Sequence, residues 1–205
     1  HGRTSPLPVL PIQYADFASW QRDWLKGDVL QSHLAYWREQ LGGELPVLEL
    51  PSYKSRPAVQ GVAGAAHQIR ITPELTKALR EFSRHKDVTL YMTLLAAFNV
   101  LLFRFTGQED IVVGSPIAGQ NRAELENLIG FFVNTLALRT DLSGGPSFNE
   151  LLARVKEVCL GAYANEDVPF EKVVEELQPE RNLERTSIFQ TLFVLFNTRR
   201  HSLQL

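Results

Sequence analysis

The chain has 205 residues, of which 44% are hydrophobic, with a formal net charge of −2 and an isoelectric point of about 6.2. This composition suits one globular domain, or a large piece of one, that buries roughly 70% of its unfolded surface. Balanced charge without a basic block argues against nucleic-acid binding. Because the most apolar run, 90–105, is too short for a membrane span and no signal peptide opens the chain, we expect a cytoplasmic protein.

The start of the chain predicts a linker followed by two helices. Residues 1–11 carry three prolines and should be extended. Residues 13–26 form the first predicted helix, whose aromatic stripe we interpret as core. Asp28, with Gln31 three residues later, is a reasonable N-cap for a second helix that ends at Gly42-Gly43. The two predicted buried stripes are Tyr14, Phe17, Gln21 and Trp24, then Leu30, Leu34, Trp37 and Leu41.

The next segment predicts a surface stretch and a strand. Residues 44–64 are rich in Pro and Gly and should lie across the surface. Apolar and polar residues alternate over 65–71, which predicts a strand. His67 lies on the apolar face of this strand with no Asp, Glu or Cys close by in the sequence. We therefore interpret His67 as a core or edge histidine rather than a ligand.

Two helices are predicted after this strand. Thr72-Pro73 is typical of a helix start, because proline is favoured at the first helical position. Thr89 opens a second helix, nearly all apolar, that runs to Phe105 and ends at Gly107. A helix that is apolar all round belongs in the middle of a fold. The first of these helices should bury Leu75, Ala78, Leu79 and Phe82.

A short strand, 111–113, and a glycine-containing loop, 114–122, come next. The glycines do not follow a phosphate-loop spacing and no Gly-Lys-Ser/Thr follows them, so a nucleotide site is unsupported. Asn121 and Glu124 form a capping-box pair that predicts a short helix ending at Leu128.

Residues 131–138 read as a central strand, since they are apolar and rich in aromatic and β-branched side chains. Neither face is polar enough for solvent, so we expect both to be covered. Asn134 interrupts this run with an amide that needs partners for its carbonyl and its two N–H groups. Either Asn134 ties down a neighbouring turn, or it faces a cavity and hydrogen-bonds a substrate.

The C-terminal part predicts a helix and a last buried strand, 189–196. Ser147 and Glu150 make a capping box for a helix that ends near Ala164. Cys159 lies on its apolar stripe, so we interpret this thiol as packing rather than as a nucleophile. A single cysteine also excludes an internal disulfide and fits a reducing compartment. No metal site is predicted.

Four segments resemble motifs of one protein family. Residues 129–139, Ile-Gly-Phe-Phe-Val-Asn-Thr-Leu-Ala-Leu-Arg, are similar to the fifth core motif of condensation domains from nonribosomal peptide synthetases. Residues 14–21 resemble the fourth motif, 165–174 the sixth and 181–190 the seventh, in family order. Glu166, Val173 and Ser187 stand where the family usually has Gln, Leu and Pro.

The resemblance implies a fold and a set of partners. The implied fold is α/β, a two-layer sandwich with a mixed sheet and covering helices, one half of a chloramphenicol-acetyltransferase-like fold. Condensation domains join two carrier-bound thioesters through a peptide bond, so the implied partners are upstream and downstream carrier domains with their phosphopantetheine arms and an adjacent adenylation domain. The resemblance places Asn134, Ser115 and Arg185 along the wall of the substrate tunnel.

The catalytic signature of this family, His-His-x-x-x-Asp-Gly, does not occur in the chain, whose histidines are at 1, 33, 67, 85 and 201. The first three family motifs are also absent. We therefore expect residues 1–205 to be a C-terminal lobe that is inactive alone, with 1–12 as a linker from the N-terminal lobe. A non-catalytic lobe that docks carrier domains is the alternative. An epimerisation domain or a fragment of a coenzyme A acyltransferase is disfavoured.

Overall fold

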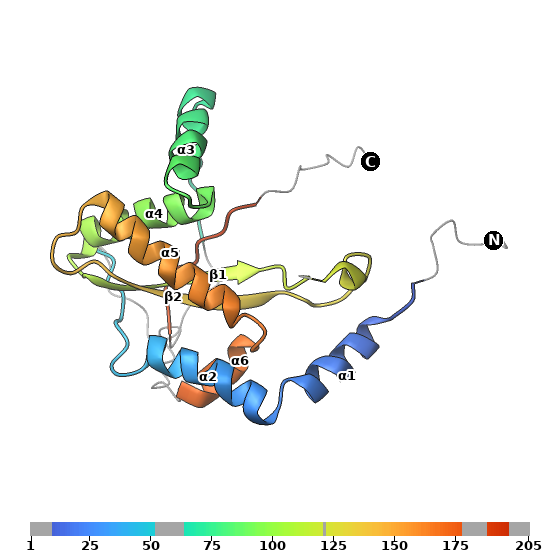
Figure 1. Cartoon of the computed structure of the whole chain (residues 1–205). Coiled ribbons are helices and arrows are strands. Elements are labelled where there is room, and N and C mark those ends of the chain that lie inside the picture. The colour runs from blue at the N-terminus through green and yellow to red at the C-terminus, as the bar shows by residue number, and fades with distance from the viewer. Residues whose placement is uncertain (1–9, 52–63, 121, 178–187, 197–205) are drawn as a thin grey trace.

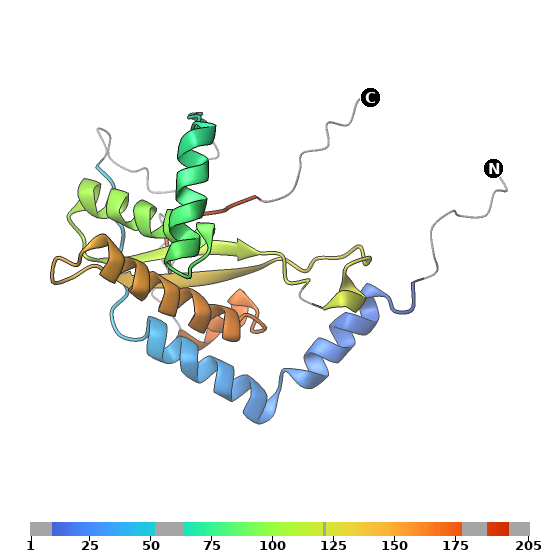
Figure 2. The same ribbon diagram turned by 45° about the horizontal axis from the view of Figure 1, so that its top comes forward.

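The computed structural model describes residues 10–51, 64–120, 122–177 and 188–196, and it has an α/β fold. Two antiparallel strands form its centre, and helix α5 runs along them (Figure 1). Helix α3 and helix α1 project away from this body in both views (Figures 1 and 2). The elements are α1 (Tyr14–Trp24), α2 (Gly27–Leu41), α3 (Pro73–His85), α4 (Leu90–Thr106), β1 (Asp110–Ile117), the 3₁₀ turn η1 (Ala123–Leu125), β2 (Asn134–Asp141), α5 (Phe148–Ala164) and α6 (Phe170–Leu177).

Side-chain caps fix where three of the helices begin. Thr72 accepts a hydrogen bond from the backbone N–H of Leu75 at 3.2 Å, as predicted for the start of α3. Thr89 caps α4 in the same way, and Ser147 forms the predicted reciprocal capping box of α5. The predicted cap of α2 is wrong, because the N-cap is Lys26, two residues before Asp28. The positive φ of 56° at Gly27 lets the chain turn out of α1 at this point.

Helix α5 supplies the most completely buried stripe of the main core. It packs on β2 and on α4, while α2 and α6 pack on each other and on β2. Helix α4 buries one face, which includes Leu95 and Ala96, but Leu101 and Phe105 are 49% and 61% exposed, so the prediction of a helix in the middle of the fold is wrong for its other face. The predicted α5 stripe is confirmed: Leu151, Leu152, Val155, Cys159 and Ala162 are all buried.

Residues 65–71 do not form the predicted strand. They are extended and exposed, because a strand needs a neighbouring ladder and they have none among the described residues. His67 is exposed rather than a core or edge histidine, and Ile69 is 78% exposed. Helix α3 likewise leaves its apolar face largely open, since Leu75 is 51% exposed and Ser83 is the buried residue of the helix.

The central strand begins three residues later than predicted. The ladder between β1 and β2 runs from Asp110 opposite Asp141 to Ile117 opposite Asn134. Residues 136–138 are successively buried, so both faces of β2 are covered there. Phe131 and Val133 precede the ladder and are exposed, which corrects the expectation that 131–133 lie in a covered strand.

The last predicted strand, 189–196, is reduced to a parallel bridge between Leu192 and Gly114 of β1. Gly114 donates its N–H to the carbonyl of Thr191 and accepts from the N–H of Phe193, each at 2.9 Å. The described sheet itself is the antiparallel pair of β1 and β2, with this parallel bridge beside it, and Leu192 is exposed rather than buried. Gly114 permits this approach, because a Cβ there would lie 2.6 Å from a methyl carbon of Leu192.

Candidate functional site

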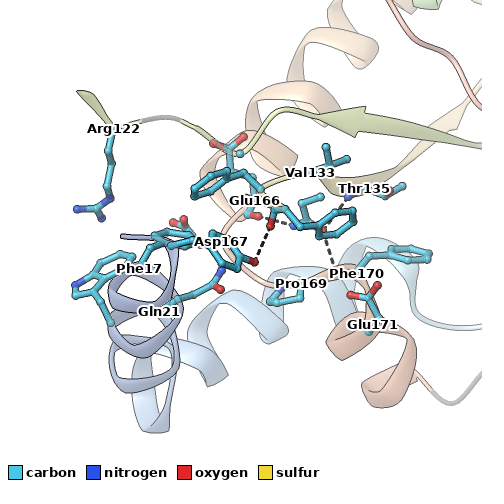
Figure 3. Close-up of a pocket in the computed structure, with 16 residues that line it drawn as sticks. Phe17, Gln21, Arg122, Val133, Thr135, Glu166, Asp167, Pro169, Phe170 and Glu171 are labelled. Carbon is cyan, nitrogen blue, oxygen red and sulfur yellow. Dashed lines mark hydrogen bonds between the residues drawn. The ribbon is translucent and has the colours of Figure 1, made fainter. Parts of the chain in front are cut away.

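A cavity of about 260 Å³ opens between α1, the segment that leads into β2, and the connection from α5 to α6. Its lining comes from Tyr14, Phe17, Trp20 and Gln21, from residues 131–135, and from the connection 166–171 apart from Val168. Figure 3 shows Phe17 and Gln21 on one side of the cavity and Phe170 and Glu171 on the other. Segments that are far apart in the sequence thus meet at one site.

The α1 wall belongs to a second hydrophobic cluster, separate from the main core. Its buried members are Leu125, Leu128 and Phe132. The rings of Tyr14 and Phe132 meet edge to face at 5.2 Å, and Phe17 lies 5.0 Å from the same phenyl ring. These ring contacts join α1 to the segment before β2 and so close one side of the cavity.

The opposite wall depends on Asn134, the first residue of β2. Its side-chain Nδ2 donates to the carbonyls of Glu166 and Val168 at 2.7 and 2.8 Å. Its Oδ1 accepts from the backbone N–H groups of Thr135 and Phe170 at 2.8 and 3.0 Å. Both donors and the carbonyl oxygen of the amide are therefore used. Asn134 borders the cavity while it fixes the connection that leads into α6.

The charged side chains around the cavity are mainly acidic. Glu166, Asp167 and Glu171 contribute carboxylates, whereas Arg122 contributes the one guanidinium among the described lining residues. This guanidinium lies 4.3 Å from the centre of the Trp20 ring, a cation–π arrangement. The cavity therefore combines an aromatic wall with an excess of negative charge.

Ser115 lies on β1 and is buried away from the cavity lining. Ser115 pairs with Leu136, and two positions further along the ladder Ile117 pairs with Asn134. The side chains of Ser115 and Asn134 therefore point to the same face of the sheet. The hydroxyl oxygen of Ser115 accepts from the hydroxyl of Tyr91 at 2.6 Å. Burial raises the pKa of Tyr91 to about 12, so this donor stays protonated near neutral pH.

Of the predicted tunnel residues, Asn134 reaches the cavity, Ser115 lies behind it, and Arg185 falls outside the described residues. Sequence reasoning missed Trp20, Arg122 and Asp167. Trp20 lies within the predicted fourth-motif segment and could have been found there. Asp167 likewise lies within the predicted sixth-motif segment, whereas Arg122 lies in a connection and carries no periodic signal. The interpretation of Tyr14, Phe17 and Gln21 as core is wrong, since they line the cavity and no residue of α1 is buried.

No group of three or more His, Cys, Asp or Glu side chains suited to a metal occurs in the described ranges. Within the same ranges, no single helix has the length and hydrophobicity of a membrane span. Helices α3 and α4 meet that criterion only when taken together, and they are bent by 105° where they join.

Comparison with known proteins relates the whole chain to one family. A family model described as Condensation domain matches residues 1–204. One of the subunits of the linear gramicidin synthase of Brevibacillus parabrevis is 58% identical over 196 residues, which are 96% of this chain and 2% of that protein. Phosphinothricin tripeptide synthetase PhsC of Streptomyces viridochromogenes is 45% identical, over 97% of this chain and 18% of that protein. The chain thus spans less than a fifth of these relatives.

Solved structures share the fold. The crystal structure of the X-domain from teicoplanin biosynthesis matches with a TM-score of 0.84 and 29% identity, over 93% of this chain and 44% of that chain. The complex of the X-domain and OxyB from the same biosynthesis matches with a TM-score of 0.83 and 30% identity, over 93% of this chain and 43% of that chain.

Proposed function

Because the chain belongs to the condensation-domain family, we propose that it is the C-terminal lobe of such a domain and walls the site where carrier-bound thioesters form a peptide bond. The observation that carries the proposal is the convergence of the segments similar to motifs four, five and six on one cavity. These three segments are far apart in the sequence, and yet all of them line the same cavity. Their meeting there supports a shared role in the site rather than three separate local roles.

The proposed reaction joins an acceptor amine to the carbonyl carbon of a donor thioester. The amine nitrogen forms the new C–N bond and loses a proton, while the C–S bond breaks and the carrier thiol leaves. Such a reaction needs an oriented amine, a route for the proton and stabilisation of the oxyanion. The residues at the cavity can orient a substrate, and we assign the proton transfer to the His-His-x-x-x-Asp-Gly motif of an N-terminal lobe.

The substrates would arrive on the phosphopantetheine arms of upstream and downstream carrier domains, with an adenylation domain next to them. We assign Asn134 and Ser115 to the framework of the tunnel wall, and Arg185 to the wall on the basis of the resemblance alone. The apolar side chains of Ile129, Phe131 and Val133, which are 97%, 76% and 52% exposed, form a surface suited to contact with the N-terminal lobe. All of these partners fit a cytoplasmic synthetase.

A second candidate is a non-catalytic lobe that docks partner proteins. One observation favours it: a structural neighbour with 30% identity is an X-domain in complex with OxyB. This candidate predicts binding of carrier domains without turnover, so one experiment separates the two functions.

The test is to mix donor-loaded and acceptor-loaded carrier proteins with an intact domain that contains residues 1–205, and in parallel with this chain alone. We expect peptidyl product with the intact domain and both thioesters unconsumed with the chain alone. Binding of the carriers to the intact domain without product would favour the docking function. Product from the chain alone, above the rate without enzyme, would contradict the assignment of the proton transfer to another lobe.

A further inference from the structure

Tyr14 makes an unusually complete contact with the segment that leads into β2. Its hydroxyl donates to the carbonyl of Phe131 at 2.9 Å, across 117 positions of sequence. Its ring covers Gly130, where a Cβ would lie 2.7 Å from the ring carbon Cγ. A residue with any side chain at 130 would therefore push the ring away or move the segment.

The same segment presents its other side chains to solvent. Ile129, Phe131 and Val133 are all exposed, whereas Phe132 turns inward onto Tyr14 and Phe17. The inward contacts of 129–133 with α1 thus centre on the Tyr14 ring and hydroxyl. Tyr14 therefore holds this segment through both its ring and its hydroxyl, next to the ring contact of Phe17.

The two walls of the cavity are held in place by different contacts. Asn134 fixes the wall formed by the connection into α6, through hydrogen bonds to the backbone. Phe131 to Val133 form part of the facing wall, and they depend on α1. We propose that Tyr14 is a positioning residue that sets the distance between these walls, with Gly130 as the surface that receives its ring.

This inference rests on the proposed function for the identity of the ligand, the aminoacyl thioester that carries the acceptor amine. Tyr14 acts through the segment 129–133, and its hydroxyl is already engaged with a backbone carbonyl. Its loss should therefore weaken substrate binding and leave the chemical step unchanged. In kinetic terms KM rises while kcat stays constant, the signature of lost binding that is equal in ground and transition states.

The experiment uses an intact domain that contains residues 1–205 and an aminoacyl-N-acetylcysteamine thioester as the acceptor probe. Dissociation constants and single-turnover rates are measured for wild type, Gly130→Ala, Tyr14→Phe, Tyr14→Ala, the double variant Tyr14→Ala/Gly130→Ala, and the control Gly64→Ala. A Cβ at Gly64 meets nothing within 4 Å, so the control carries the same chemical change without the overlap. Tyr14→Phe keeps the ring on Gly130 and removes only the hydrogen bond. This variant therefore tests the positioning role even if Gly130→Ala does not fold.

We expect Gly130→Ala to raise the dissociation constant at least fivefold and Tyr14→Phe to raise it about two- to tenfold, the range that one hydrogen bond gives. Gly64→Ala should have no effect. In the Tyr14→Ala background, Gly130→Ala should add nothing, because the ring that it overlaps is gone. Unchanged dissociation constants in Gly130→Ala and Tyr14→Phe would overturn the proposal, even if their melting temperatures fall. Wild-type binding of the probe without peptide formation would contradict the proposed function while the positioning role stays supported by the cycle.

Discussion

The side-chain oxygen of Asn134 accepts a hydrogen bond from the backbone N–H of Phe170 at 3.0 Å, so the first residue of β2 holds the first residue of α6. Phe170 begins α6, so its backbone N–H has no carbonyl of an earlier helical turn to bond with. The amide of Asn134 satisfies it from another part of the chain. This contact joins the fifth-motif and sixth-motif segments directly.

Asn134→Ala should lower the stability of the fold. The change leaves two carbonyls and two backbone N–H groups without the amide, at a cost of roughly 1–3 kcal/mol. For a domain of this size that is a fall of roughly 2–12 °C in the unfolding midpoint, measured by circular dichroism. Asn127→Ala, at an exposed position seven residues earlier, is the matched control and should leave the midpoint unchanged.

The single-turnover rate of the same variant, in an intact domain, separates the two roles of Asn134. A rate per folded molecule that falls tenfold or more, about 1.4 kcal/mol in the barrier, would support a role at the substrate. A lowered midpoint with an unaltered rate per folded molecule would show that the amide is only a structural tie.

Arg139→Lys should destabilise the end of the ladder between β1 and β2. The Arg139 guanidinium binds both carboxylate oxygens of Asp110 and donates to the carbonyls of Gly42 and Glu44. Lysine cannot reproduce these forked contacts, so the two carbonyls lose their donors. Since the side chain is partly exposed, we expect a loss of about 1 kcal/mol in the urea unfolding free energy.

The control for this prediction is Arg104→Lys, in the last turn of α4, where the residue is exposed and the positive charge is kept. It should shift the urea midpoint by much less than Arg139→Lys. Equal shifts in the two variants would mean that the contacts of Arg139 add no stability.

Cys159 should resist alkylation as long as the protein is folded. The thiol is fully buried, and burial raises its pKa to about 12, so almost no thiolate forms at pH 8. Native protein treated with iodoacetamide should show no added mass after an hour, whereas protein in urea should gain one label. One label per chain within minutes under native conditions would refute the interpretation of Cys159 as packing.

The Asp141 carboxylate should stabilise the fold at pH values above the pKa that Asp141 has in the unfolded chain, and it should not do so at pH values below the pKa that it has in the folded chain. It accepts hydrogen bonds from the N–H and the hydroxyl of Ser143, which lower its pKa below the ordinary value of 3.8, and Arg154 acts in the same direction. Because the folded state favours the charged form, its contribution is lost as the pH falls through the folded pKa. Asp141→Asn should therefore weaken the protein at pH 7 more than at pH 3.

The size of this effect should be small, since the carboxylate is largely exposed. Urea midpoints at the two pH values measure it, with Glu39→Gln at an exposed position of α2 as the control. An identical loss for Asp141→Asn at both pH values would contradict the linkage.

The helices could be predicted from the sequence because their signals are local. The capping residues Thr72, Thr89 and Ser147 each act within one turn, and the structure confirms all three. The buried stripe around Cys159 follows from a period of 3.6 residues alone.

The strands were harder to predict because a strand is defined by its neighbour. Residues 65–71 alternate as a strand should, yet they have no ladder partner among the described residues. The start of β2 depends on the register that pairs Ile117 with Asn134, which apolar content cannot reveal. The cavity could not be predicted from the sequence for the same reason, because it is formed by segments that are distant in the chain. Asn134 stands out in the sequence as an anomaly, but its partners at 166–170 lie more than thirty positions away.

The second hydrophobic cluster attaches α1 to the rest of the chain separately from the main core. Helix α1 has no fully buried residue, and its bond from Tyr14 to Phe131 closes a loop of more than a hundred residues. Such a closure is entropically costly and is rewarded only once the sheet has placed the segment before β2. We expect the amides of α1 to exchange with solvent by local opening, at a lower free energy than those of α5. We therefore expect α1, and with it one wall of the cavity, to open while the sheet and the main core stay folded.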